Sequence, residues 1–225
     1  MNGHENKDHL RNKFTILFQY VFAVILLLNS QMGEWGMNII KHRYTGEQIT
    51  FLKTTKETNG KFLYIEVALP PLGKGPPLHL HDQFEEEFEV ISGQLTLIIN
   101  KEERILKPGE KAIAAIRTKH TFKNQHDEPV VFRVMLTPGV LFEESARIHY
   151  GLMDEGLTND KGDPTKLAHT ALILSMQNTL VAGLPVVLQR KMFQYIVRRG
   201  IKKGTYNDFE KYIGRPIKEV LEGQV

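Results

Sequence analysis

Residues 73–93 read GKGPPLHLHDQFEEEFEVISG and bring two histidines and a glutamate close together along the chain. His79 and His81 are two positions apart in a segment that we expect to be extended, so both imidazoles should leave the same face. Glu86 follows in the same stretch, and His120 lies in a later predicted strand. Three imidazoles and one carboxylate suit Mn, Fe, Co, Ni, Cu or Zn and leave coordination positions open. The set predicts one divalent metal ion.

Each of these residues also has an ordinary interpretation. A His-x-His pair on a strand is often a surface or hydrogen-bonded pair, and the glutamates at 85–89 can form a solvated acidic edge. His120 can be a strand-end residue. Residue type alone therefore leaves the metal site as a hypothesis.

The surrounding sequence is typical of a β structure. Eight short segments rich in β-branched and aromatic residues recur at roughly 8–12 residues, the spacing of an all-β sandwich or barrel. Pro108-Gly109 suits a type II turn, and residues 100–102 can close a hairpin. The predicted strands are 49–54, 61–69, 88–93, 94–99, 103–107, 111–116, 120–124 and 130–136.

The opening stretch resembles the first sequence motif of the cupin superfamily. The match is complete at the positions that define the motif, namely Gly73, His79, His81, Glu86 and Gly93.

The second cupin motif is matched in part by GEKAIAAIRTKHTFKN, residues 109–124. Gly109, His120 and Asn124 are in place. Ala115 and Arg117 stand where the family usually has Pro and Gly. These departures lie in the loop that leads to His120 and bear on the shape of the pocket mouth, not on the ligands.

The resemblance implies a mainly β fold, an antiparallel jelly-roll-like cupin β-barrel over residues 45–140, with the metal inside near one end. Cupins carry Fe, Mn, Ni, Zn or Cu, and the resemblance does not distinguish among these metals. The family includes dioxygenases, isomerases, epimerases and non-enzymatic binding proteins, so the fold selects no single chemistry. A chain with one motif pair is similar to single-barrel members, which commonly form homodimers.

Two functional hypotheses follow. The first is a metal-dependent enzyme, an oxidoreductase of the dioxygenase kind or an isomerase, acting on a small organic substrate. The second is a non-catalytic module that binds or senses a small molecule, with a metal that holds the ligand or supports the fold.

Five residues near the ligands in the sequence are candidates for substrate binding. The aromatic ones could form an apolar wall and the polar ones could reach an anion or a carbonyl. Core packing of the aromatic residues and exposure of the polar ones are the alternatives. The candidates are Gln83, Phe84, Phe88, Arg117 and Phe122.

The amino-terminal segment, residues 1–36, contains the apolar run FTILFQYVFAVILLL at 14–28, preceded by basic residues. An apolar helix of this length would be about 22 Å long, short of the ~30 Å hydrocarbon core of a bilayer. A signal anchor that contacts the membrane through residues 14–31 and a cleaved export signal are two interpretations.

A third interpretation is a start codon assigned too far upstream. We expect a membrane-anchored protein if Met1 is the start, and a cytoplasmic one if translation begins at Met32 or Met37.

Residues 141–225 predict a helical extension. We expect a short helix at 140–152, a helix from Pro164 to about Val181, and another from Pro185 to about Arg199. A barrel with such a tail resembles a group of uncharacterised bacterial cupin-domain proteins.

The last of these helices has an apolar stripe made of Leu188, Met192, Tyr195 and Ile196. Residues 186–204 also hold six basic side chains and no acidic one. Contact of residues 186–203 with a membrane surface, and packing of the stripe on the barrel or on a dimer mate, both fit this pattern.

Composition excludes several classes of site and partner. The chain of 225 residues has no cysteine, so disulfides, iron–sulfur clusters and thiol nucleophiles are impossible. The formal net charge of +3 lacks the strong basic bias of nucleic-acid-binding proteins, and we predict no nucleic-acid partner.

Overall fold

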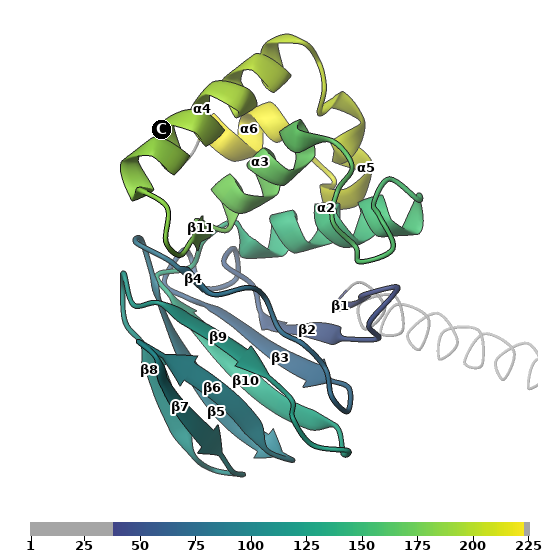
Figure 1. Ribbon diagram of the computed structural model, residues 1–225. Helices are drawn as coiled ribbons and strands as arrows, with labels where there is room; N and C mark the ends of the chain where they lie inside the picture. The colour runs from purple at the N-terminus through teal and green to yellow at the C-terminus, as the bar shows by residue number, and fades with distance from the viewer. Residues whose placement is uncertain (1–37, 223–225) are drawn as a thin grey trace, which may run out of the picture. The chain divides into compact units, whose positions relative to one another are not determined.

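The computed structural model describes residues 38–222. Residues 39–137 form two antiparallel sheets, and one short strand from later in the chain joins the second of them (Figure 1). We call residues 39–137 the β region. The first sheet has the order β1 (Ile39–Lys41), β2 (Gln48–Lys53), β3 (Leu63–Leu69), β10 (Val130–Thr137), β5 (Glu85–Ser92) and β8 (Lys111–Ala114). The second has the order β11 (Leu180–Val181), β4 (His79–Leu80), β9 (His120–Lys123), β6 (Leu95–Ile99) and β7 (Glu102–Leu106).

All eight predicted strands are present, and the predicted mainly β fold with carboxyl-terminal helices is confirmed. β1, β4 and β11 were not among the predicted strands, although the segment of β4 was expected to be extended. The predicted amino-terminal helix and the apolar run at 14–28 lie outside the described residues.

Strand alternation places the core between the sheets. In β3 every second side chain is buried from Leu63 to Leu69, and β10 runs antiparallel beside it with the same alternation. Phe132 of β10 is fully buried. This is the period-two pattern of strands with one face on the core.

Turn chemistry ends the strands as the sequence predicts. Asn100 and Lys101 both have positive φ, 50° and 77°, as the two central residues of a type I′ turn between β6 and β7 require. Gly109 has a φ of 86°, which suits the third position of the predicted type II turn.

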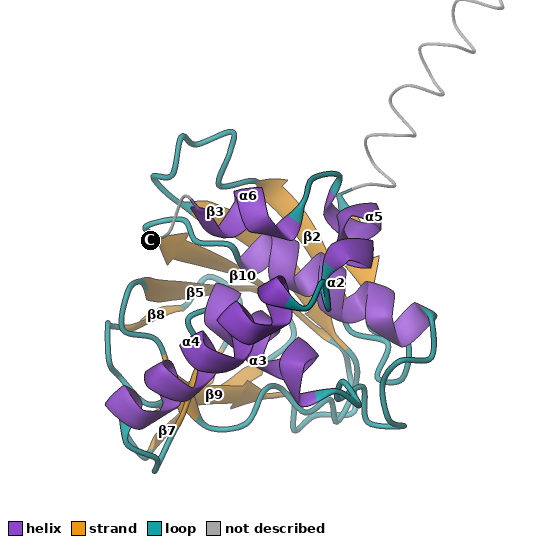
Figure 2. Cartoon of the chain, turned by 90° about the horizontal axis from the view of Figure 1, so that it is seen from above, coloured by secondary structure: helices purple, strands orange, loops and turns teal. Residues whose placement is uncertain are grey.

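The helical region, residues 142–222, covers one end of the β region (Figures 1 and 2). Its helices are α2 (Phe142–Asp154), α3 (Leu167–Met176), α4 (Val186–Lys202), the 3-10 turn η1 (Asn207–Phe209), α5 (Glu210–Ile213) and α6 (Ile217–Glu222). No helix among residues 38–222 is long and apolar enough to cross a membrane.

The prediction that the middle helix extends to Val181 was wrong. α3 ends at Met176, and Asn178 takes a left-handed conformation with a φ of 49° that stops the helix. Leu180 and Val181 then pair with Leu80 and His79 as β11 and add a strand to the second sheet. The edge of β4 satisfies their backbone groups, which a longer helix would have paired internally.

α2 is buried on two faces and belongs to two hydrophobic clusters. Ala146, Tyr150 and Met153 pack into the core of the β region. Ile148 and Leu152 belong to the core of the helical region. One helix therefore ties the two cores together.

Candidate metal centre

Four side chains from the β region converge at the end nearest the helical region. His79 lies on β4, His81 follows it directly, Glu86 lies on β5 and His120 on β9. One ligand atom from each lies within 4.8 Å of the others, and all four residues are buried. His79 and His120 are paired neighbours across the antiparallel β4–β9 ladder, so their side chains leave the same face.

Backbone carbonyls fix the three imidazoles in one tautomer. The Nδ1 atom of His79 lies 2.8 Å from the carbonyl oxygen of Pro77, and that of His120 lies 2.9 Å from the carbonyl oxygen of Thr118. The Nδ1 atom of His81 lies 3.1 Å from the carbonyl oxygen of Asn178. A carbonyl only accepts, so each Nδ1 carries the proton and each Nε2 presents a lone pair. This outer support is the usual one for metal-bound histidines.

The contact between His120 and Glu86 suits two side chains that could share one cation. His120 Nε2 lies 2.7 Å from Glu86 Oε2, yet this buried nitrogen has no hydrogen-bond partner among the described residues. Two lone pairs at this distance repel unless a proton or a cation lies between them. Ligands at right angles on a metal with bonds of about 2.1 Å are about 3 Å apart, close to the observed separation. The donor set therefore fits a divalent transition metal.

The pKa values at the centre suit metal binding near neutral pH. Burial, with the neighbouring His120 and His81, lowers the pKa of His79 to about 4. Burial acts to raise the pKa of Glu86, but the three histidines outweigh it and hold that pKa at about 2. His79 is then neutral and Glu86 ionised, the forms that coordinate metals.

His120 is different, because the Glu86 carboxylate raises its pKa against the opposing effect of burial. The raised pKa favours a proton on the ring nitrogen of His120 that faces Glu86. A metal bound between the two side chains would displace that proton.

The two sequence motifs meet through Asn124. Its backbone N–H donates to the carbonyl of Gly73, and its side-chain amide donates to the carbonyls of Pro70 and Glu128. The asparagine of the second motif thereby holds the loop that opens the first.

Arg117 has a left-handed backbone conformation, which glycine, the usual residue at this motif position, adopts without steric cost. Its φ is 65°, a left-handed conformation that costs a residue with a side chain about 1 kcal/mol or more. Its N–H donates to the carbonyl of His81 at 2.6 Å, which explains why the conformation persists. The departure from the motif thus leaves the loop before His120 in a shape that supports the ligands.

Asn178 of the helical region holds the segment that carries His81, a role that the sequence did not reveal. Its side-chain oxygen accepts hydrogen bonds from the backbone N–H groups of Asp82 at 2.8 Å and Gln83 at 3.0 Å. Its amide group donates to the carboxylate of Asp82, and Arg190 of α4 pairs with the same carboxylate. We call Asn178, Asp82 and Arg190 the Asn178 clamp. The only signal in the sequence was a polar interruption of an apolar stretch.

The predicted substrate-binding residues divide into two groups. Phe84 is buried with its ring stacked on that of His81 at 4.1 Å between centroids, and Phe88 is buried in the core. Phe122 is partly buried against the same core, and Gln83 and Arg117 are exposed. Their role toward a substrate stays a prediction.

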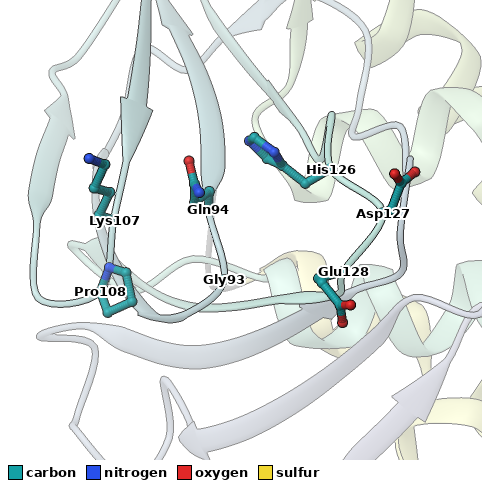
Figure 3. A pocket seen from close by; sticks show the side chains of 7 residues that line it. All are labelled: Gly93, Gln94, Lys107, Pro108, His126, Asp127 and Glu128. Carbon is teal, nitrogen blue, oxygen red and sulfur yellow. The ribbon is translucent and has the colours of Figure 1, made fainter.

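A pocket of about 450 Å³ lies away from the four ligands, where the turn after β5 meets the turn after β7 and the β9–β10 loop (Figure 3). Its lining contains no ligand and no predicted substrate-binding residue. The residues that line it are Gly93, Gln94, Lys107, Pro108, His126, Asp127 and Glu128.

Comparison with known families identifies this part of the chain. Residues 65–137 match the model of the cupin domain. The protein contains a cupin domain. The matched range spans β3 to β10 and includes all four candidate ligands, so the predicted relationship is confirmed.

Individual relatives match only in part. An oxidoreductase from Arthrobotrys oligospora is 56% identical over 41 residues, which are 18% of this chain and 16% of that protein. A sugar phosphate isomerase of the cupin superfamily from Silicibacter pomeroyi is 28% identical over 42% of this chain and 60% of its own, with a TM-score of 0.37. A protein described as a predicted oxalate decarboxylase, from Thermotoga maritima, is 18% identical over 44% of this chain and 90% of its own, with a TM-score of 0.40.

Proposed function

We propose that the protein is a metal-dependent oxidoreductase of the dioxygenase kind that acts on a small organic substrate at the cupin-domain centre. The observation that carries the proposal is the convergence of three imidazole nitrogens and one carboxylate oxygen within 4.8 Å in a buried site. A divalent metal bound there would supply Lewis acidity and, for Fe, Mn or Cu, redox chemistry. The short match to a fungal oxidoreductase supports this reaction class over isomerisation.

The residues of the chain have separate tasks in this proposal. His79, His81, Glu86 and His120 hold the metal, and their backbone partners keep each Nε2 pointed inward. Phe84 and Phe88 exclude water from one side, because both are buried next to the histidines. Exclusion of water strengthens the electrostatic interactions within such a site.

Elemental analysis and oxygen uptake together test the proposal. The full chain, purified without a histidine tag, should contain about one transition metal per protein. Oxygen consumption should appear with a member of a panel of phenols, diketones and sugars, and should disappear in His120→Ala. Stoichiometric metal with no oxygen uptake after loading with Fe, Mn, Ni or Cu would contradict the oxidoreductase.

One observation favours a second candidate, a binding or sensing module in which the metal holds a ligand or supports the fold. The four candidate ligand residues are only 2–8% exposed, and the helical region contacts the segment that carries His81. Chelation of the metal should then lower the melting temperature, and a bound small molecule should raise it without forming product. Turnover of that molecule would exclude this candidate.

The homodimer stays a prediction, as do the cellular location and the use of residues 14–31 at a membrane. Cupin family members bind small-molecule ligands or substrates, and we propose a small organic molecule as the partner of this chain.

A further inference from the structure

α4 has two long faces of different character. Its buried face carries Gln189, Phe193, Val197 and Gly200. Phe193 and Val197 pack into the core of the helical region, and the helix contacts α3 along this side. In Figure 1, α4 forms the outer margin of the helical region.

The opposite face exposes a ridge of large apolar side chains. Leu188, Met192 and Tyr195 follow one another at the spacing of a helical stripe and are 63%, 43% and 64% exposed. Leu184 and Val187, just before this stripe, are 57% and 66% exposed. The fourth residue of the predicted stripe, Ile196, is partly buried against the core of the helical region. Among residues 38–222, the stripe therefore does not pack on the β region. Single exposed apolar residues are ordinary, but five together mark an interaction surface.

Basic side chains continue the ridge toward the end of the helix. Residues 186–204 carry six lysines and arginines and no acidic residue, and only Arg190 forms an ion pair with another described residue. At 3.6 residues per turn, Arg199 and Lys202 lie in line with Leu188 and Tyr195. The remaining exposed basic residues are Lys191, Arg198 and Lys203.

We propose that this outer face of α4 docks the protein on an anionic lipid membrane. The ridge has the chemistry of an interfacial helix, with leucine, valine and methionine for the acyl boundary and tyrosine for the headgroup level. The free lysines and arginines complement a negative lipid surface. The helix lies along the surface and does not span it.

Charge argues against a second copy of the chain as the occupant. A two-fold contact through this face would bring the same surface of both copies together. Five basic side chains from each copy, which form no ion pair within residues 38–222, would then lie close to one another, and no acidic residue of 186–204 offsets them. An anionic bilayer attracts the same set.

The proposed docking face lies on α4, the helix that contributes Arg190 to the Asn178 clamp. Gln189 exchanges hydrogen bonds with the backbone of Val181 in β11, and Arg190 pairs with Asp82. Both residues lie on the side of α4 away from the ridge, so changes to the ridge should leave the metal centre intact.

Sedimentation with vesicles tests the charge part of the proposal. The full chain should bind vesicles of phosphatidylcholine with phosphatidylglycerol, bind pure phosphatidylcholine vesicles weakly, and release at high salt. Each basic side chain at such a surface contributes about fivefold in affinity, so reversal of three should weaken binding about a hundredfold or more. The variant to test is Arg198→Glu, Arg199→Glu and Lys202→Glu. The matched control, with the same net charge on exposed sites of the β region, is Lys56→Glu, Lys61→Glu and Lys101→Glu.

A fluorescent label tests whether the ridge itself enters the membrane. Because the chain has no cysteine, Leu188→Cys can carry a single environment-sensitive dye. Ile105→Cys is the control, since Ile105 is an apolar side chain of β7 that is 49% exposed. Anionic vesicles should shift the emission of the dye at 188 to the blue and leave the dye at 105 unchanged.

Four outcomes would overturn the proposal. The first is equal binding to neutral and anionic vesicles, and the second is an equal loss of vesicle affinity in both triple variants. The third is binding that leaves the emission of the dye at 188 unchanged, which would place the contact at another segment such as 14–31. The fourth is a blue shift that rises with protein concentration in the absence of lipid, which would identify a second copy as the occupant.

Discussion

The β region and the helical region support the candidate metal centre in different ways. The β region supplies all four ligands and also the carbonyls of Pro77 and Thr118, each two residues before the histidine that it fixes. The helical region supplies no ligand, but it provides the carbonyl that fixes His81, from a residue 97 positions away in sequence. The candidate ligands and two of their three carbonyl partners therefore come from neighbouring stretches of the chain, while the orientation of His81 depends on a distant segment.

The largest effect should come from removing a ligand supplied by the β region. Loss of an outer partner of a metal ligand typically weakens metal binding about 10- to 100-fold, so loss of a ligand itself should exceed a factor of about 100. We expect His120→Ala to lose its metal during dialysis against a competing chelator. His126→Ala is the control, because His126 lies in the β9–β10 loop outside the ligand cluster. Equal metal loss in both variants would contradict the assignment.

Truncation on either face of α2 tests whether the two regions are separate folding units. Leu152 packs in the helical core and Met153 in the β core, and both are fully buried. Leu152→Ala and Met153→Ala should each lower the free energy of unfolding by about 2–5 kcal/mol. Because α2 belongs to both cores, chemical denaturation should show one transition in each variant.

The exposed Leu188→Ala is the control and should change stability by less than about 0.5 kcal/mol. Two transitions, with Leu152→Ala shifting only one of them, would show that the regions unfold independently.

Loss of the Asn178 clamp should weaken metal binding without removing a ligand. Asn178→Gly keeps the left-handed backbone at no steric cost and deletes the amide that holds Asp82 and Gln83. We expect metal affinity to fall about 10- to 100-fold, less than for His120→Ala, as measured by competition with a chelator.

Asn159→Gly provides a matched control in the helical region. Asn159 organises an exposed turn through Lys161 and Asp163 and does not contact the ligands. It should lower stability and leave metal affinity unchanged. Unchanged affinity in Asn178→Gly would show that the β region alone positions His81.

The features that could be predicted from the sequence lie mostly in the β region, and those that could not lie mostly in the helical region. The eight strands and four candidate ligands could be predicted because their signals are local: alternation within β3, a turn pair at Asn100-Lys101, and a histidine pair two positions apart. Arg117 departs from the cupin pattern, and its positive φ is a conformation that glycine adopts most easily.

The contribution of the helical region could not be predicted, because it depends on pairing between distant residues. Apolar residues resume at Leu180 after the polar residues 177–179, so the pattern favoured a helix that extends to Val181. Leu180 and Val181 form β11 instead, because the edge of β4 is available. The same holds for Asn178, whose side chain meets partners 95 and 96 positions away. A single sequence carries no signal for such contacts.

The smallest effect concerns the junction of the two regions, where Tyr150 of α2 donates a hydrogen bond to Glu47 of the β region at 2.7 Å. Burial raises the pKa of Glu47, against the opposing effect of this hydrogen bond. Glu47 therefore binds its proton more tightly in the folded chain than in the unfolded one. The resulting stabilisation is complete below the unfolded pKa of 4.5 and is lost as the pH rises through the folded pKa.

Glu47→Gln removes this titration and keeps an oxygen to accept from Tyr150. Near pH 4 its melting temperature should be close to that of the parent chain, and it should become the higher of the two as the pH rises toward 7. His42 and His149 are present in both proteins, so their titration cancels in the difference. Tyr150→Phe should do the reverse, with its largest loss of stability at the higher pH, because the ionised carboxylate then lacks its donor. If Glu47→Gln instead loses stability relative to the parent as the pH rises, the charged form of Glu47 stabilises the junction and the sign of the pKa shift is wrong.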